Sequence, residues 1–230
     1  MGNNKTLNIL GCVPQLLNIL FELTNEATGI ENFRIFNNMP IDNLNYLNPL
    51  NGIKVDFVEF NKVNKTPNPE GIFALSVVGT KSKEIVHSQF KKLFNLENKQ
   101  FINLIHPTSY VSRSVQLTHG LQLEPLSTIA SCTTIGFGVN IKRNCNIGHH
   151  CELDDFVTIN PGVTLSSFVK IGKKTMIGSG TSVKEKITIG ENSIIGVGSV
   201  VVKDIPNNCI AFGNPCVVQR MNNKKEDNNK

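Results

Sequence analysis

The sequence predicts a small α/β unit over residues 1–105, a parallel β-helix over residues 106–220 with a C-terminal cover segment, and a disordered tail over residues 221–230. Two observations predict the β-helix: every sixth residue from Val111 to Val201 is Val, Ile or Leu, and a column of mostly small or β-branched residues lies four positions later. A third observation predicts the α/β unit, because short apolar runs alternate there with amphipathic segments.

The first unit is expected to contain a parallel sheet with helices between its strands. The helix predicted last in this unit is amphipathic, with Val86 and Phe90 on its apolar face. The expected elements are a strand at 7–10, a helix at 16–23, strands at 53–60 and 72–78, a helix at 82–96 and a last strand at 101–105.

The six-residue repeat predicts a coil with three flat sides. A period of six fits neither an α-helix nor an ordinary β-meander, and the spacing is too regular for a β-sandwich. The aliphatic column is expected to face inward, and glycines such as Gly136 and Gly148 relieve crowding near the corners. Three sides of six residues make an 18-residue coil, and stacked coils pair as parallel strands.

The segment after Val201 is expected to close the last coil as an extended cover strand. An uncovered coil would leave a row of backbone groups without partners. Prolines and turn residues at 206–215 suit such a cover.

Composition excludes several classes of function. The net charge of +5 comes without an Arg/Lys stripe interleaved with aromatic residues, so nucleic acid is not expected, whereas a small phosphate-bearing ligand is. No run approaches the roughly 20 apolar residues of a membrane span, so no membrane association is expected. The six cysteines form no CxxC pair and follow no secretory signal, which indicates reduced thiols and a cytoplasmic protein. The histidines lack recognisable ligand spacing, so no metal is expected.

The segments Gly196–Pro206 and Gly213–Pro215 resemble the C-terminal signature of the hexapeptide acyltransferases. The layout, with Asn103–Thr108 at the join, is similar to that of bacterial sugar acetyltransferases of the sialic-acid O-acetyltransferase and bacillosamine-pathway N-acetyltransferase type. This resemblance implies a left-handed β-helix, a homotrimer, and acetyl-coenzyme A bound between neighbouring prisms.

The resemblance also implies a histidine general base in a His-x-Cys segment followed by an acidic–aromatic pair, which matches residues 149–151 and 155–156. It assigns the base to His149, whereas periodicity alone leaves His149 and His150 as alternatives at a coil corner. Imidazole titrates near neutral pH, which suits a general base. His150 stands where relatives usually carry Glu or Asp, so Asp154, Asp155 or a backbone carbonyl is expected to orient His149.

The coenzyme is expected to lie along the prism. Ser167 comes one coil after His149, where its backbone N–H would meet the thioester oxygen. The other expected coenzyme-binding residues are Gly180, Lys184, Glu185, Lys186, Val197, Gly198 and Lys203. Some relatives hold nucleotide-sugar phosphates in a loop after the first strand, so Gly11, Cys12, Val13 and Pro14 are expected to bind the substrate.

The function expected from this sequence is acetyl-CoA-dependent N-acetylation of a nucleotide-linked amino sugar, with His149 as general base. O-acetylation of a sialic-type sugar is an alternative. A non-catalytic β-helix that binds a ligand is another, because His150 and Thr158 replace the acidic neighbour and the second His of relatives. Cys151 belongs to the inward column and is expected to be buried rather than a nucleophile.

Overall fold

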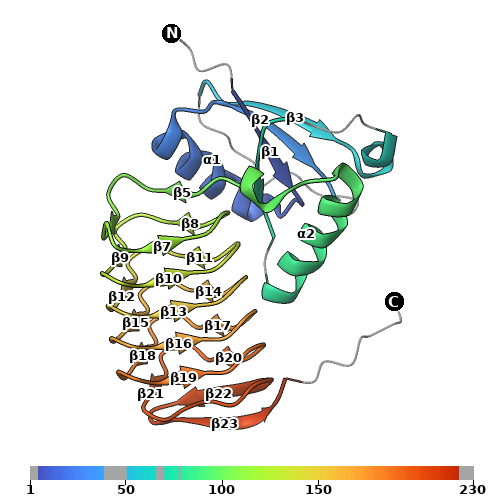
Figure 1. Ribbon diagram of the computed structural model, residues 1–230. Helices are drawn as coiled ribbons and strands as arrows, with labels where there is room; N and C mark the ends of the chain where they lie inside the picture. Colours follow the sequence, from blue (N-terminus) through green and yellow to red (C-terminus); the bar gives the residue numbers. More distant parts are fainter. Residues whose placement is uncertain (1–4, 39–50, 66–69, 78, 223–230) are drawn as a thin grey trace.

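The computed structural model describes residues 5–38, 51–65, 70–77 and 79–222 of the chain. Within these residues an α/β unit sits on one end of a stack of coils, and a C-terminal hairpin closes the other end (Figure 1). The predicted succession of an α/β unit, a parallel β-helix and a C-terminal cover is therefore confirmed. No helix in the described part of the chain is long and apolar enough to cross a membrane.

The α/β unit is a four-stranded parallel sheet in the order β3-β2-β1-β4, with one helix on each face. Helix α1 packs on the face that carries Leu7 and Ile9, whereas α2 packs on the face that carries Leu10 and Phe73. The elements are β1 (Thr6–Leu10), α1 (Pro14–Thr28), β2 (Asn32–Phe36), β3 (Lys54–Val58), the 3-10 helix η1 (Phe60–Lys65), β4 (Ile72–Leu75), α2 (Thr80–Phe94) and the 3-10 helix η2 (Asn98–Gln100).

Strand β2 was not expected from the sequence. Its apolar run is short and is interrupted by Arg34, which is exposed and forms an ion pair with Asp56 of β3 at 2.8 Å. The two predicted helices and the strands near 7–10, 53–60 and 72–78 are confirmed in type, with shifted ends. Residue 78, at the end of one predicted strand, lies outside the described residues.

The strand expected at 101–105 as the last of the α/β unit was wrongly assigned. Phe101 makes only an isolated bridge to Phe73, and β5 (Leu104–Ile105) pairs with β8 of the prism instead. Leu104 lies opposite Gln122, which is one 18-residue coil later (122 − 104 = 18), so β5 already follows the register of the repeat. The prism therefore begins before the boundary expected at residue 106.

The prism is built from two-residue strands, and each member of the predicted aliphatic column is the second residue of a strand. Each strand pairs in parallel with the strand one coil away, as Asn146–Ile147 does with Thr164–Leu165. The strands are β6 (Tyr110–Val111), β7 (Gln116–Leu117), β8 (Gln122–Leu123), β9 (Thr128–Ile129), β10 (Thr134–Ile135), β11 (Asn140–Ile141), β12 (Asn146–Ile147), β13 (Glu152–Leu153), β14 (Thr158–Ile159), β15 (Thr164–Leu165), β16 (Lys170–Ile171), β17 (Met176–Ile177), β18 (Ser182–Val183), β19 (Thr188–Ile189), β20 (Ile194–Ile195) and β21 (Val200–Val201).

Three sheets, parallel except for the last strand β23, form the sides of the prism. We call them the six-strand face (β6 to β21), the five-strand face (β7 to β19) and the eight-strand face (β5 to β23). The aliphatic column fills the interior together with the second column, whose members from Ser127 to Ser199 are all buried. The repeat in the sequence thus specifies both the register and the core.

The cover is a hairpin rather than the single extended strand that was expected. Strand β22 (Cys209–Gly213) adds in parallel to β20, and β23 (Cys216–Met221) returns antiparallel to β22 because the chain reverses between them. Asn222 is buried and donates a side-chain hydrogen bond to the carbonyl of Asn192 at 2.7 Å. The ordered chain therefore extends past the expected boundary at residue 220, and 223–230 lie outside the described residues.

Candidate functional site

Turns between the three faces form the three edges of the prism. The histidine edge, between the six-strand and five-strand faces, comprises the turns at 131–132, 149–150, 167–168 and 185–186. The glycine edge, between the eight-strand and six-strand faces, comprises the turns at 161–162, 179–180 and 197–198. The α2 edge, between the five-strand and eight-strand faces, comprises the turns at 137–138, 155–156 and 173–174.

His149 and His150 lie side by side on the histidine edge, and both are exposed. Their Nδ1 atoms are 2.9 Å apart, which is hydrogen-bond distance, so one ring donates to the other. His150 occupies the left-handed region of backbone space (φ 57), as do Leu126 and Phe168 at equivalent turn positions. The sharp corner therefore turns both imidazoles outward from the prism.

Phe168 completes this cluster and was not singled out from the sequence. Its ring stacks on His150 at 4.9 Å between centroids and 19° between planes, and it meets His149 edge-on at 5.2 Å. Phe168 follows His150 by 18 residues, so the repeat length itself would have revealed the contact. The Phe168 side chain is 42% exposed, so the cluster lies on the surface of the prism.

Neither aspartate expected to orient His149 contacts it in this structure. Asp154 and Asp155 lie at the α2 edge, and the Asp155 carboxylate accepts a hydrogen bond from the backbone N–H of Phe137 at 2.7 Å. Burial, reinforced by the negative charge of Asp155, raises the pKa of Asp154. In a single chain, the expectation that Asp154 or Asp155 orients His149 is therefore wrong. The group that bonds to the His149 imidazole is the ring of His150.

The expected coenzyme-binding residues divide between two edges. Ser167 and Glu185 follow His149 along the histidine edge, one and two coils later, and Lys203 lies in the bend that follows β21. Gly180 and Val197 lie on the glycine edge. The six-strand face separates the two groups. A ligand that touches both groups must therefore lie across this face or between the edges of two neighbouring prisms.

Among the described residues, no group accepts a hydrogen bond from the Ser167 N–H, while the neighbouring Phe168 N–H bonds to the carbonyl of His149 at 3.0 Å. Gly148 allows this approach, because a Cβ at that position would lie 2.7 Å from the Ser167 nitrogen. A free N–H one coil from His149 is suitably placed to stabilise an oxyanion.

Cys151 is fully buried, as the sequence predicted. Its thiol donates to the carbonyl of Ser166 at 3.2 Å, and burial raises its pKa. A protonated, inaccessible thiol does not act as a nucleophile. Cys151 is therefore part of the core beneath the histidine pair.

The loop 11–14 closes the carboxyl end of β1 tightly. The Gly11 N–H bonds to the carbonyl of Phe36 at 2.9 Å, and a Cβ at Gly11 would lie 2.8 Å from a methyl group of Val77. The buried N–H of Cys12 donates to the side-chain oxygen of Asn38 at 3.4 Å, and burial raises the pKa of the Cys12 thiol to about 11. The backbone donors of Gly11 and Cys12 are thus engaged within the protein.

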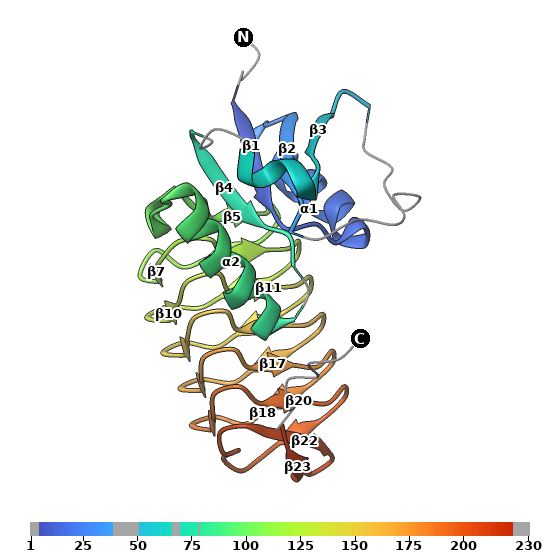
Figure 2. The ribbon, with the colours of Figure 1, turned by 90° about the vertical axis from the view of Figure 1, so that its right-hand side faces the viewer.

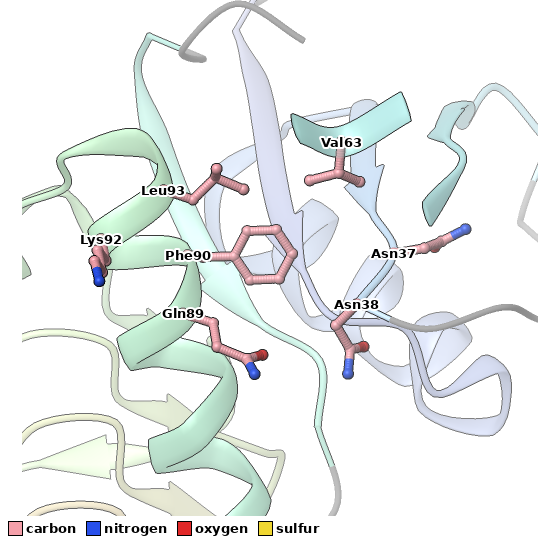
Figure 3. A pocket seen from close by; sticks show the side chains of 7 residues that line it. All are labelled: Asn37, Asn38, Val63, Gln89, Phe90, Lys92 and Leu93. Atoms are coloured by element: carbon pink, nitrogen blue, oxygen red, sulfur yellow. The ribbon is translucent and has the colours of Figure 1, made fainter. Parts of the chain in front are cut away.

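A cavity of about 670 Å³ opens beside this loop, between the carboxyl end of β2 and helix α2 (Figure 3). Apolar side chains from η1 and α2 face it, and the amides of Gln89 and Asn38 lie at one side of it (Figure 3). Asn37 is 8% exposed, and its side-chain oxygen has no hydrogen-bond partner within the described residues. The lining residues are Asn37, Asn38, Val63, Gln89, Phe90, Lys92 and Leu93. No sequence pattern had marked this cavity, since it forms only when α2 and β2 come together.

Helix α2 fixes this unit to the prism, along whose upper coils it runs (Figure 2). His87 packs against Phe137 and Phe156 of the α2 edge with centroid distances of 4.6 and 5.6 Å. Glu84 forms ion pairs with Lys173 at 2.8 Å and with Lys174 at 3.0 Å. Burial lowers the pKa of His87, which favours its neutral form in this aromatic environment.

Within the described residues, no group of three or more His, Cys, Asp or Glu side chains is arranged to hold a metal ion.

Comparisons with known proteins agree with this architecture. The family model described as bacterial transferase hexapeptide (six repeats) matches residues 168–203. A comparison with curated protein sequences finds no match.

Several solved structures resemble the chain over nearly its whole length. A histidine-to-asparagine mutant of perosamine N-acetyltransferase from Caulobacter crescentus, in complex with CoA and GDP-perosamine, shares 21% identity over 95% of this chain and 98% of that chain, with a TM-score of 0.78. The acetyltransferase domain of PglB from Neisseria gonorrhoeae, in complex with acetyl coenzyme A, shares 22% identity over 94% and 100%, also with a TM-score of 0.78. WeeI from Acinetobacter baumannii shares 19% identity over 94% and 100%, with the same TM-score. The chain therefore has the fold of these hexapeptide-repeat proteins.

Proposed function

We propose that this protein is an acetyl-CoA-dependent N-acetyltransferase that acts on a nucleotide-linked amino sugar. The observation that carries the proposal is the histidine pair on an open prism edge, one coil from a free backbone N–H. Similar folds have been solved with CoA and GDP-perosamine, and with acetyl coenzyme A.

In this proposal His149 is the general base. The acceptor amine attacks the thioester carbonyl, and the Nε2 atom of His149 removes the proton that the nitrogen loses. The N–H of Ser167 donates to the oxygen that becomes negatively charged. The C–S bond then breaks, and the proton passes to the departing thiolate of coenzyme A.

The coenzyme lies between two copies of the chain in this proposal. Ser167, Lys184, Glu185 and Lys203 lie on or near one edge, and Gly180, Val197 and Gly198 lie on another. A groove between neighbouring prisms brings the histidine edge of one copy to the glycine edge of the next. A closed ring of three such contacts gives a homotrimer with three equivalent sites.

The acceptor nucleotide is assigned to the cavity between β2 and α2. Its volume of about 670 Å³ suits a small organic ligand. The unpaired side-chain oxygen of Asn37 and the ring of Phe90 suit a planar base, and Lys92 offers a charge for a phosphate. The loop 11–14 supports this site through Asn38.

The cavity borders α2, which packs on the α2 edge, whereas His149 lies on a different edge of the same prism. An acceptor held in one copy is therefore expected to meet His149 of a neighbouring copy. This arrangement makes assembly a requirement for activity.

The test is an assay of thiol release from acetyl-CoA with a panel of nucleotide-linked amino sugars, comparing wild type with His149→Ala. We expect the substitution to lower the rate by at least about 10²-fold, because general-base catalysis contributes roughly that much. Size-exclusion chromatography checks that the variant keeps the assembly of the wild type. A variant with more than about a tenth of the wild-type rate would refute the assignment of the base.

Product analysis separates the alternatives. Mass spectrometry after mild base treatment distinguishes an amide from an ester, so a base-labile product would indicate O-acetylation of a hydroxyl. Binding of coenzyme A without turnover of any acceptor would favour a non-catalytic ligand-binding protein.

A further inference from the structure

We propose that His150 is a positioning residue that accepts the Nδ1–H of His149 and so leaves the Nε2 lone pair of His149 free for the acceptor amine. The proposal rests on the proposed function, because it concerns the same site. It assigns the two rings different tasks: His149 moves the proton, and His150 selects the tautomer of His149.

The 2.9 Å contact between the two Nδ1 atoms fixes the proton count of the pair. A neutral imidazole has one N–H and one lone pair, so a bond between two Nδ1 atoms needs one protonated and one unprotonated nitrogen. If His149 donates, its Nε2 atom is a base, and His150 carries its own proton on Nε2. If both Nδ1 atoms carried protons, the contact would be repulsive.

Phe168 distinguishes the two rings. It stacks nearly parallel on His150, with 19° between the planes, and covers one face of that imidazole. His149 touches the same phenyl ring only edge-on, at 86°. The backbone of His150 is also held at φ 57 in the corner of the coil. His150 is therefore the ring held by packing, and His149 is the ring oriented by a hydrogen bond to it.

No other group in the described part of the chain takes this task. The hydrogen bonds and ion pairs of the structure bring no carboxylate or ammonium group to either imidazole. The carboxylate of Asp155, in the next turn along the chain, already accepts the N–H of Phe137 on the α2 edge. On the histidine edge itself, His150 is flanked by Cys132 one coil earlier and Phe168 one coil later, and neither is a carboxylate.

The proton balance of the reaction is kept. When the Nε2 atom of His149 takes the proton from the amine, His149 becomes a cation that still donates its Nδ1–H to the lone pair of His150. This bond stabilises the positive charge during the step in which it forms. His149 then gives the Nε2 proton to the thiolate of coenzyme A, and the pair returns to its starting state.

Two variants separate this task from a structural one. In His150→Asn the side-chain oxygen occupies nearly the place of Nδ1 and keeps the acceptor, and Asn144 already occupies an equivalent corner. In His150→Leu the acceptor is lost, and Leu126, with φ 59, shows that leucine tolerates the equivalent turn position on another edge of the prism. We expect His150→Leu to lower kcat by about 10²-fold with an unchanged KM for acetyl-CoA. His150→Asn should keep kcat within about tenfold of wild type.

A spectroscopic readout does not depend on knowing the acceptor. Long-range ¹H–¹⁵N NMR of histidine-labelled protein reports which ring nitrogen carries the proton. At a pH where the rings are neutral, we expect His149 to carry it on Nδ1 in wild type and in His150→Asn. In His150→Leu we expect the proton on Nε2 or a mixture of the two tautomers.

The outcomes separate failure of the proposal from failure of the proposed function. If His149→Ala remains active, the assignment of the base fails. If His149→Ala is inactive and His150→Leu keeps wild-type kcat and tautomer, only the positioning role is wrong. If His150→Asn is as inactive as His150→Leu while His149 keeps its tautomer, His150 is itself the base and the proposal is overturned.

Discussion

The ammonium group of Lys83 in α2 donates a hydrogen bond of 2.9 Å to the hydroxyl of Thr158 in β14, on the eight-strand face of the prism. The same group reaches the side-chain oxygen of Asn140 at 2.8 Å and the carbonyl of Gly138 at 3.2 Å. Lys83 is only 2% exposed. One buried side chain thus links the helix that borders the proposed acceptor cavity to two adjacent coils of the β-helix.

Removing this link should loosen α2 from the prism. Lys83→Met keeps most of the length of the side chain and leaves the acceptors on the eight-strand face without a donor. Because buried polar groups without partners are costly, we expect the free energy of unfolding to fall by about 2 kcal/mol. Urea unfolding measures this change, and Lys81→Met, on the exposed side of the same helix, is the matched control. Equal stability of the two variants would contradict a linking role for Lys83.

The same lysine should make stability depend on pH. Burial, and secondarily the positive charge of Lys142, lowers the pKa of Lys83 from 10.5 to about 7. Between these values the unfolded chain holds a proton that the folded chain has released, so this group makes the folded state more stable as pH rises through that window. Urea unfolding at pH 7 and pH 9.5 should therefore show a difference between wild type and Lys83→Met that grows with pH. A constant difference would mean that the ammonium stays charged when buried.

The sequence predicts the prism almost completely and the α/β unit only in part. The column from Val111 to Val201 specifies strand, register and interior at once, because each coil repeats the same local environment. Strand β2 belongs to no such repeat, and the exposed Arg34 interrupts the short apolar run that would have predicted it. The Lys83–Thr158 contact could not be predicted from the sequence either. A lysine on an amphipathic helix is expected to be exposed to solvent, and its burial depends on how α2 packs against the prism.

The candidate site shows the same division. His149 and Ser167 share an edge because the 18-residue coil places them there, and that relationship is present in the sequence. The hydrogen-bond partner of His149 could not be predicted, because Asp154 and His150 are both near it in the chain. Which of these side chains points toward the His149 imidazole depends on the backbone conformation of the corner, and the sequence does not specify that direction. The cavity lined by Phe90 and Asn38 likewise depends on packing between distant segments.

The glycine before the histidine pair should be intolerant of substitution for a reason of space. A Cβ at Gly148 would lie 2.7 Å from backbone atoms of the next coil, whereas a Cβ at Gly180 would meet nothing within 4 Å. Gly180 has a φ of 67°, so alanine there costs only backbone strain, about 1 kcal/mol. We expect Gly148→Ala to cost at least about 2 kcal/mol, because adjacent coils must separate.

Urea unfolding of Gly148→Ala and Gly180→Ala measures the difference. Activity gives a second readout, because separation of the coils at 148 and 167 displaces Ser167 relative to His149. Gly180→Ala should leave the distance between those two residues unchanged. A larger loss of stability in Gly180→Ala than in Gly148→Ala would contradict this reason. It would show that glycine is needed on these edges for its positive φ and not for the close spacing of the coils.

The charge of Lys203 should strengthen coenzyme binding. Lys203 is exposed, and it follows His149 by three coils (203 − 149 = 54), which is roughly 14 Å along the prism. A phosphate of coenzyme A near this position would gain about 1 kcal/mol from an exposed charge, which corresponds to about fivefold in Kd. Isothermal titration calorimetry of Lys203→Glu should therefore show at least fivefold weaker binding, and the difference should shrink as salt is raised. Lys81→Glu, which makes the same charge change on α2, should bind coenzyme A as wild type does. Equal affinity of Lys203→Glu and Lys81→Glu would place the coenzyme phosphates elsewhere on the prism.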